Sequence, residues 1–275
     1  MKSSKIIEES MQLYIQGKYQ ETLDYIYFNY DKNQPNVVVD NIIICSLSKL
    51  NKVDEAIIEL DRSFIKEKFW CMPEILENDP DLTNISSHIK FKNVLKICKE
   101  RYETLRFTDP YMEVIESDSD ELFMMLHGNQ QSLEELHDRF DKESMRNQLL
   151  AFPRASEQVM SGIFIWNDFV RSKLEIAEHY KSLLKKYSLN PKKAICGAFS
   201  AGGTVLLENV LEGKMNVKKL LLIEPWLPRY EEIKDNLIKL KDQKVRVYLM
   251  SGDVNKPLYE MAKTLANQFE NIGIP

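Results

Sequence analysis

Lys193-Ala-Ile-Cys-Gly-Ala-Phe-Ser-Ala-Gly-Gly203 is the stretch of sequence that decides the fold. A short apolar run leads into Ser200, two glycines follow it closely, and an amphipathic segment continues from Thr204 to Leu211. This order predicts a strand, a sharp turn and a helix, with a serine at the bend.

The residues around Ser200 fit a nucleophile elbow, a strained strand-to-helix turn that exposes a reactive serine. Such a turn needs small residues two before and two after the serine, because neighbouring backbone comes close there. Those positions hold Ala198 and Gly202, which gives A-x-S-x-G in place of the usual G-x-S-x-G. The alternative is a glycine-rich turn that binds a phosphate or only turns the chain. Neither G-x-G-x-x-G nor the lysine of a P-loop is present.

Composition is that of an ordinary globular protein and excludes several classes of function. The 275 residues are 44% hydrophobic and 29% charged, and the net charge of −5 gives no electrostatic basis for binding nucleic acid. The four cysteines form no C-x-x-C pair, so neither a zinc site nor a disulfide framework is indicated, and we expect no metal and no cofactor. The sequence begins without an apolar leader and has no apolar run that would span a bilayer. We therefore expect a cytoplasmic protein without membrane contact.

Residues 1–105 are expected to form a helical domain. Two stretches of helical periodicity are each broken by a turn, at Gly17-Lys18 and at Asn51-Lys52, which suggests hairpins of about the tetratricopeptide length. The segment that follows, with the aromatic pair Phe69-Trp70 and the turn Asn78-Asp-Pro-Asp-Leu82, is similar to the cap found after such repeats. A cap of this kind covers the apolar face of the last repeat.

Residues 106–275 change to a pattern of strands alternating with helices. The run Leu122-Phe-Met-Met-Leu126 is continuously apolar, as in a strand buried on both faces of a parallel sheet. The alternation predicts an α/β fold with a mainly parallel, doubly wound sheet. The expected strands are Met112–Ile115, Leu122–Leu126, Gln148–Phe152, Ala194–Phe199, Leu220–Ile223 and Val245–Met250.

This second part resembles the α/β-hydrolase superfamily, especially its carboxylesterase and dienelactone-hydrolase-like members. The first part resembles the helical domain of relatives that carry tetratricopeptide-like repeats. Four stretches carry the resemblance to the hydrolases: Leu126-His-Gly-Asn129, Ala151-Phe-Pro-Arg-Ala-Ser156 with Phe164-Ile-Trp-Asn-Asp168, Cys196-Gly-Ala-Phe-Ser-Ala-Gly-Gly203, and Met250-Ser-Gly-Asp-Val-Asn255.

The resemblance implies a role for several of these residues. Ser200 would be the nucleophile, and the turn His127-Gly128-Asn129 would be the oxyanion loop. The two oxyanion donors would be the backbone N–H groups of Asn129 and Ala201. Trp166 would belong to a segment that lines the substrate cleft.

The remaining triad members are less complete in this sequence. The family pattern G-x-x-D after the late strand puts Asn255 where the acid is expected; Asp253, two residues earlier, and Glu224, after the preceding strand, are the other candidates. On this fold the triad histidine follows the acid, yet no histidine follows His179. We therefore expect either a hydrolase domain that is incomplete at its C-terminus, without the last strand, or a non-catalytic descendant.

Two functions follow as hypotheses. The first is a serine hydrolase acting on a carboxylic ester or related small acyl substrate, with activity reduced by the absent triad histidine. The second is a pseudo-hydrolase that binds a small molecule or a partner protein through its cleft or its helical repeats.

Overall fold

The computed structural model describes residues 2–138, 140, 145 and 147–274, and the chain folds as two compact units. The helical unit comprises Met1–Phe107 together with Gln158–Ile163, and the sheet unit comprises Thr108–Glu157 and Phe164–Pro275. The prediction of a mainly parallel sheet preceded by an α-helical domain is confirmed.

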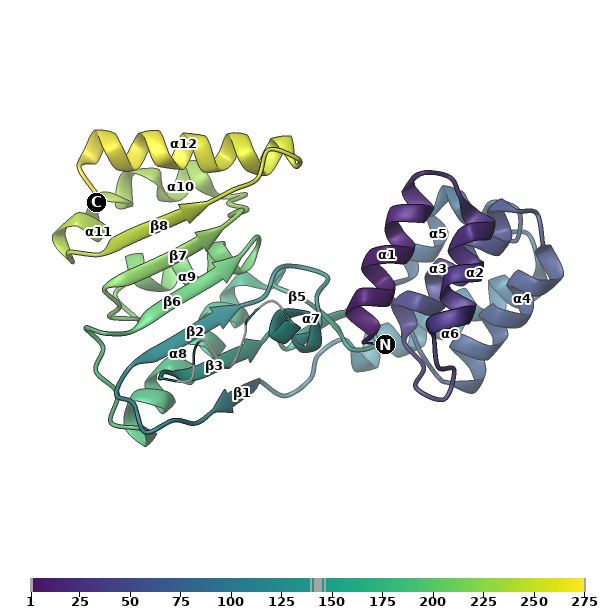
Figure 1. The fold of residues 1–275 in the computed structure, drawn as a ribbon, viewed down its shortest axis with the longest axis horizontal. Coiled ribbons are helices and arrows are strands. Elements are labelled where there is room, and N and C mark those ends of the chain that lie inside the picture. Colours follow the sequence, from purple (N-terminus) through teal and green to yellow (C-terminus); the bar gives the residue numbers. More distant parts are fainter. Residues whose placement is uncertain (1, 139, 141–144, 146, 275) are drawn as a thin grey trace. The chain divides into compact units, whose positions relative to one another are not determined.

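The helical unit consists of successive helices that pack on one shared apolar core (Figure 1). They are α1 (Ser3–Ile15), α2 (Tyr19–Asn29), α3 (Val37–Lys49), α4 (Val53–Asp61), α5 (Pro73–Glu77) and α6 (Ile89–Leu105). A π-helical turn, Arg62–Lys66, extends α4, and a 3-10 turn, Pro80–Leu82, precedes α6. Helix α3 is buried over most of its surface, so it forms the centre of this unit.

Two turns in this unit have the same geometry 34 residues apart. Gly17 and Asn51 both adopt the left-handed conformation, with φ of 75° and 58°, and end a first helix. In each turn the next residue, Lys18 or Lys52, returns its N–H to a carbonyl of the helix just ended, at 3.1 and 2.9 Å. The interval equals the length of a tetratricopeptide repeat. Membership of that repeat class remains a prediction.

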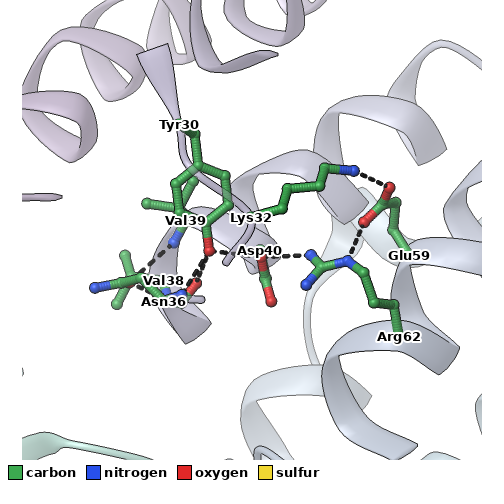
Figure 2. Close-up of polar contacts among 8 residues, drawn as sticks. All are labelled: Tyr30, Lys32, Asn36, Val38, Val39, Asp40, Glu59 and Arg62. Atoms are coloured by element: carbon green, nitrogen blue, oxygen red, sulfur yellow. Dashed lines mark hydrogen bonds and ion pairs between the residues drawn. The ribbon is translucent and has the colours of Figure 1, made fainter. Parts of the chain in front are cut away.

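A buried carboxylate links the helices of this unit (Figure 2). Asp40 on α3 is fully buried, and its Oδ1 accepts hydrogen bonds from Arg62 at 2.5 Å and from the Tyr30 hydroxyl at 3.1 Å. The other side of the Arg62 guanidinium donates to Glu59 at 2.7 Å, and Glu59 also pairs with Lys32 at 2.7 Å. Burial alone would raise the pKa of Glu59, but the hydrogen bonds from these two cations lower it.

The sheet unit contains six strands in the spatial order β1-β3-β2-β6-β7-β8 (Figure 1). Only the edge strand β1 runs antiparallel to its neighbour; the other pairings described are parallel. The predicted neighbours at Leu122–Leu126 and Ala194–Phe199 are therefore confirmed as adjacent parallel strands. The strands are β1 (Tyr111–Ile115), β2 (Leu122–Leu126), β3 (Leu149–Arg154), β6 (Ile195–Phe199), β7 (Lys219–Ile223) and β8 (Arg246–Met250).

Helices cover both faces of the sheet, as the alternation of side chains in β2 shows. Phe123 and Met125 pack with Leu136 of α7 (Leu133–Asp138), whereas Met124 and Leu126 pack in the larger core on the other face. That larger core receives residues of α8 (Phe169–Lys186), α9 (Gly202–Leu211) and α12 (Lys256–Ile272). Two short helices, α10 (Tyr230–Ile233) and α11 (Ile238–Asp242), lie between β7 and β8 in the sequence.

A short hairpin, which the sequence did not predict, follows β3. Strands β4 (Glu157–Met160) and β5 (Ile163–Ile165) form a separate two-stranded sheet, and the residues Gln158–Ile163 belong to the helical unit. There the backbone of Met72 donates to the carbonyl of Val159 at 2.7 Å. The hairpin therefore supplies the segment before α5 with backbone partners.

The Asp40 network predicts a large difference between two substitutions. Asp40→Asn should destabilise the helical unit by about 3 kcal/mol, because it removes the charge that balances a largely buried guanidinium. Lys32→Ala is the matched control at the outer end of the same network, where the side chain is 45% exposed, and should cost less than about 1 kcal/mol. Urea unfolding followed by far-UV circular dichroism measures both. Equal losses would contradict the central role of Asp40.

Candidate active site

Ser200 lies directly after β6 and before α9, in a conformation that costs energy. Its φ of 49° is in the left-handed region, which a serine adopts at a cost of about 1–3 kcal/mol. The surrounding backbone holds it there. The Ser200 N–H donates to the carbonyl of Ile223 at 2.9 Å, and its carbonyl accepts from Gly203 at 2.9 Å and from Trp226 at 3.1 Å.

Small residues flank this serine because other backbone comes very close. A Cβ at Gly202 would lie 2.5 Å from the carbonyl oxygen of His127 and 3.0 Å from the Leu126 Cβ, so no larger residue fits without displacing backbone. A Cβ at Gly128 would likewise lie 2.7 Å from the ring of Phe199. The elbow after β6 is thus fitted directly against the turn after β2.

Three strained residues gather at one edge of the sheet. Gln130, Ser200 and Glu224 all have positive φ, at 60°, 49° and 45°, and follow the neighbouring strands β2, β6 and β7. The carboxyl ends of parallel strands share one edge, where ligands of open α/β sheets bind. Backbone strain of this kind concentrates at functional sites, so this edge is the candidate site.

The turn after β2 is held in place by hydrogen bonds from both of its ends. The Gly128 N–H donates to the side chain of Gln131 at 2.7 Å, and the Gln130 N–H donates to the carbonyl of Phe164 at 2.8 Å. The Asn129 side chain accepts from the Trp166 N–H at 2.7 Å and donates to the Asn167 side chain at 3.1 Å. The turn is therefore preorganised.

Two backbone donors remain without an acceptor at this edge. In the part of the chain that the structure describes, neither the Asn129 N–H nor the Ala201 N–H donates a hydrogen bond to the protein. The Ser200 hydroxyl likewise has no hydrogen-bond partner among the described residues. Helix α9 begins at Gly202, so the positive end of its dipole lies beside the serine. The arrangement is able to stabilise negative charge on an oxygen bound next to Ser200.

Comparison with known proteins matches the helical unit to a family model. Residues 2–106 match the family model described as "A/B hydrolase-like, N-terminal domain". No curated protein sequence gave a significant match. The sheet order, the elbow and this N-terminal domain agree with one another. The chain has the α/β-hydrolase fold.

Solved structures resemble the hydrolase fold of this chain to different degrees. An uncharacterised protein from Bacillus cereus ATCC 10987 is 26% identical, covers all of this chain with 89% of its own length, and gives a TM-score of 0.54. A Bacillus cereus carboxylesterase is 12% identical over 62% of this chain and 99% of its own, with a TM-score of 0.41. An esterase of the bacterial hormone-sensitive lipase family is 10% identical over 65% and 77%, with a TM-score of 0.44.

His127 is a structural residue in this hydrolase fold, because both of its ring nitrogens are used. Nδ1 lies 2.6 Å from the Gly128 carbonyl, and Nε2 accepts from the Ala155 N–H at 3.1 Å, so the proton belongs on Nδ1. The ring is fully buried, and burial lowers its pKa to about 4. This neutral imidazole, with both nitrogens engaged in hydrogen bonds, is not available as a base for Ser200.

The other three histidines have surroundings of their own. His88 caps α6 in the helical unit, where its Nδ1 accepts from the Lys90 N–H. His137 in α7 lies 3.3 Å from Glu113, and His179 in α8 is largely buried, which lowers its pKa. No histidine forms a hydrogen bond with Ser200 among the described residues.

The three residues considered for the position of the triad acid have different surroundings. Asn255 is the N-cap of α12, where its side chain accepts from the Leu258 N–H at 3.4 Å. Asp253 is exposed in the loop after β8, and no ion pair or hydrogen bond of its side chain is found within the described part of the chain. Glu224 directly follows Ile223, the residue that binds the Ser200 N–H, and its carboxylate accepts from the Gly252 N–H at 3.3 Å. Glu224 is the carboxylate that the backbone ties most closely to the elbow.

Trp166 and Trp226 have opposite surroundings. Trp166 is fully buried, donates from Nε1 to the His127 carbonyl at 2.7 Å and stacks on the His127 ring at 4.5 Å. It therefore supports the turn from behind and does not line an open cleft as expected. Sequence reasoning missed Trp226, which is 38% exposed and donates its backbone N–H to Ser200. The signal was Glu224-Pro-Trp226 immediately after a strand.

His127 predicts a pH dependence of stability. Its folded pKa of about 4 is below the ordinary value of 6.5, so the unfolded chain binds a proton that the folded chain does not. The contribution of neutral His127 to the free energy of unfolding is therefore fully present above about pH 6.5 and is lost as the pH falls towards 4. The loss amounts to about 2 kcal/mol between pH 7 and pH 5. Urea unfolding at both pH values should show a smaller difference for His127→Gln than for the wild type. An unchanged difference would show that other groups cause it.

Proposed function

We propose that the chain binds a carboxylic ester or related acyl compound at Ser200 and hydrolyses it slowly. The observation that carries this proposal is the strained serine together with two N–H groups, those of Asn129 and Ala201, that have no acceptor among the described residues. Donors placed in this way typically contribute about 2.7–4 kcal/mol each to stabilising an acyl-transfer transition state.

The same geometry is the reason to expect slow turnover. A serine hydroxyl is a weak nucleophile and needs a base within hydrogen-bond reach. Both ring nitrogens of His127 are occupied, and the three other histidines are placed elsewhere. Oxyanion stabilisation and binding without a complete triad still accelerate hydrolysis by about 10³–10⁴-fold over water.

A second candidate function follows from the observation that no histidine is hydrogen-bonded to Ser200 in the described part of the chain. If no base ever reaches Ser200, the site acts as a binding pocket, and the chain is a pseudo-hydrolase for a small molecule. A protein partner bound through the helical repeats belongs to the same candidate. Ser200-dependent chemistry separates the two candidates.

Imidazole in solution should replace the missing base. We expect p-nitrophenyl acetate and butyrate to be hydrolysed very slowly by the wild type, with a rate that rises with added imidazole. Ser200→Ala should show only the rate of imidazole in buffer, because the nucleophile is gone. Rapid wild-type turnover without imidazole would mean that a histidine of this chain does reach Ser200. Identical rates for both proteins at every imidazole concentration would favour the binding function.

The imidazole assay also identifies the carboxylate that orients the base. Glu224→Gln should lower the Ser200-dependent part of the imidazole effect about tenfold or more, whereas Asp253→Asn should leave it nearly unchanged. This order follows from the position of Glu224 beside the elbow and of Asp253 in an exposed loop. The reverse order would assign the acid to the loop after β8.

A further inference from the structure

A chain of contacts leads from Ser200 to the turn after β2. The Trp226 N–H donates to the Ser200 carbonyl, and the Trp226 ring lies 6.4 Å from the ring of Phe169, centroid to centroid. Phe169 begins α8, and its N–H donates to the carbonyl of Asn167 at 3.0 Å. The Asn167 side chain accepts from Asn129 at 3.1 Å, in the turn after β2. Two aromatic rings therefore belong to the chain of contacts that joins Ser200 to this turn.

An arginine packs against the Phe169 ring and is itself held by an ion pair. The Arg229 guanidinium lies 5.5 Å from the centre of the Phe169 ring, a distance at which cation–π attraction holds the ring. Arg229 in turn forms a two-pronged ion pair with Glu208, a carboxylate on α9 that is only 3% exposed. Lys173 of α8 also pairs with Glu208, at 3.0 Å. The ion pairs of Glu208 thus hold in place the guanidinium that lies over the Phe169 ring.

The ion pair between Arg229 and Glu208 also determines the charge beside the two aromatic rings. The carboxylate of Glu208 pairs with Arg229, which lies over the Phe169 ring, so Arg229 is not free to attract an anionic substrate. What remains for a ligand is the exposed part of the Trp226 indole and the partly buried Phe169 ring. Such a surface gains free energy by covering apolar groups and offers no attraction to an anionic one.

We propose that Phe169 and Trp226 form the wall that receives the apolar part of the acyl group. The site then selects esters with an uncharged alkyl or aryl acyl chain over those with a short or anionic one. The inference rests on the proposed function, because it places the chain of an acyl group bound at Ser200. Trp226 is the specificity-determining residue, and Phe169, Arg229 and Glu208 position it.

Alkyl fluorophosphonates of increasing chain length test the wall, because they phosphonylate serine with loss of fluoride. In the presence of imidazole, full burial of each methylene would raise the labelling rate constant about threefold to fourfold. A chain that lies against one wall should gain about tenfold in total from ethyl to hexyl. Trp226→Ala should reduce this hexyl-to-ethyl ratio to about twofold, and Trp226→Phe should restore most of it.

The control is Tyr259→Ala, which removes a ring that is exposed to the same 38% on α12. It should keep the wild-type ratio. The wall is disproved if Ser200 is labelled and Trp226→Ala keeps the wild-type ratio as well. If Ser200 is not labelled by any probe, the proposed function fails, and the wall is judged by binding alone. Saturation-transfer NMR should then detect hexanamide, and not acetamide, on the wild type, with loss of the hexanamide signal in Trp226→Ala; equal signals from both proteins would overturn the wall.

Discussion

The space between Gly202 and the carbonyl oxygen of His127 constrains the whole candidate site. A Cβ at position 202 would lie 2.5 Å from that oxygen, so α9 begins in direct contact with the turn after β2. The contact fixes the distance between two neighbouring strand ends and therefore between the Ala201 and Asn129 donors. It also leaves Ser200 little choice but a left-handed conformation, because the chain must turn within one residue. The absence of a Cβ at Gly202 thus permits both the strained conformation of Ser200 and the close packing of the two turns that carry the N–H donors.

His127 illustrates how a residue type that catalyses in many hydrolases serves here to build the site. Its ring binds the backbone on both sides and stacks between buried groups, and Trp166 fixes its carbonyl. That carbonyl is the one that meets Gly202. The contacts that order the turn after β2 are therefore the same ones that engage both nitrogens of His127. His127 is engaged in holding the turn to which it belongs.

The sequence predicted the parts whose pattern is local and missed those that depend on contacts. The apolar run Leu122–Leu126 and the elbow strand carry a clear strand signal, and both lie where predicted. Asn255 was assigned by counting from Gly252, although Asn255-Lys-Pro257 is also a helix-start signal, and the structure uses it as a cap. The positive φ of Glu224 and the exposure of Trp226 arise from neighbouring strands and loops; Glu224-Pro-Trp226 after a strand signals only that a loop begins there.

The hairpin at Gln158–Ile163 has a consequence for how such proteins are assembled and inherited. The chain leaves the sheet after β3, supplies backbone partners to the segment around Met72, and returns for α8. A family boundary drawn at residue 106 therefore omits six residues on which the helical unit depends. The two units are not interchangeable modules: recombination that exchanged residues 2–106 alone would also require a compatible hairpin from the other half of the gene.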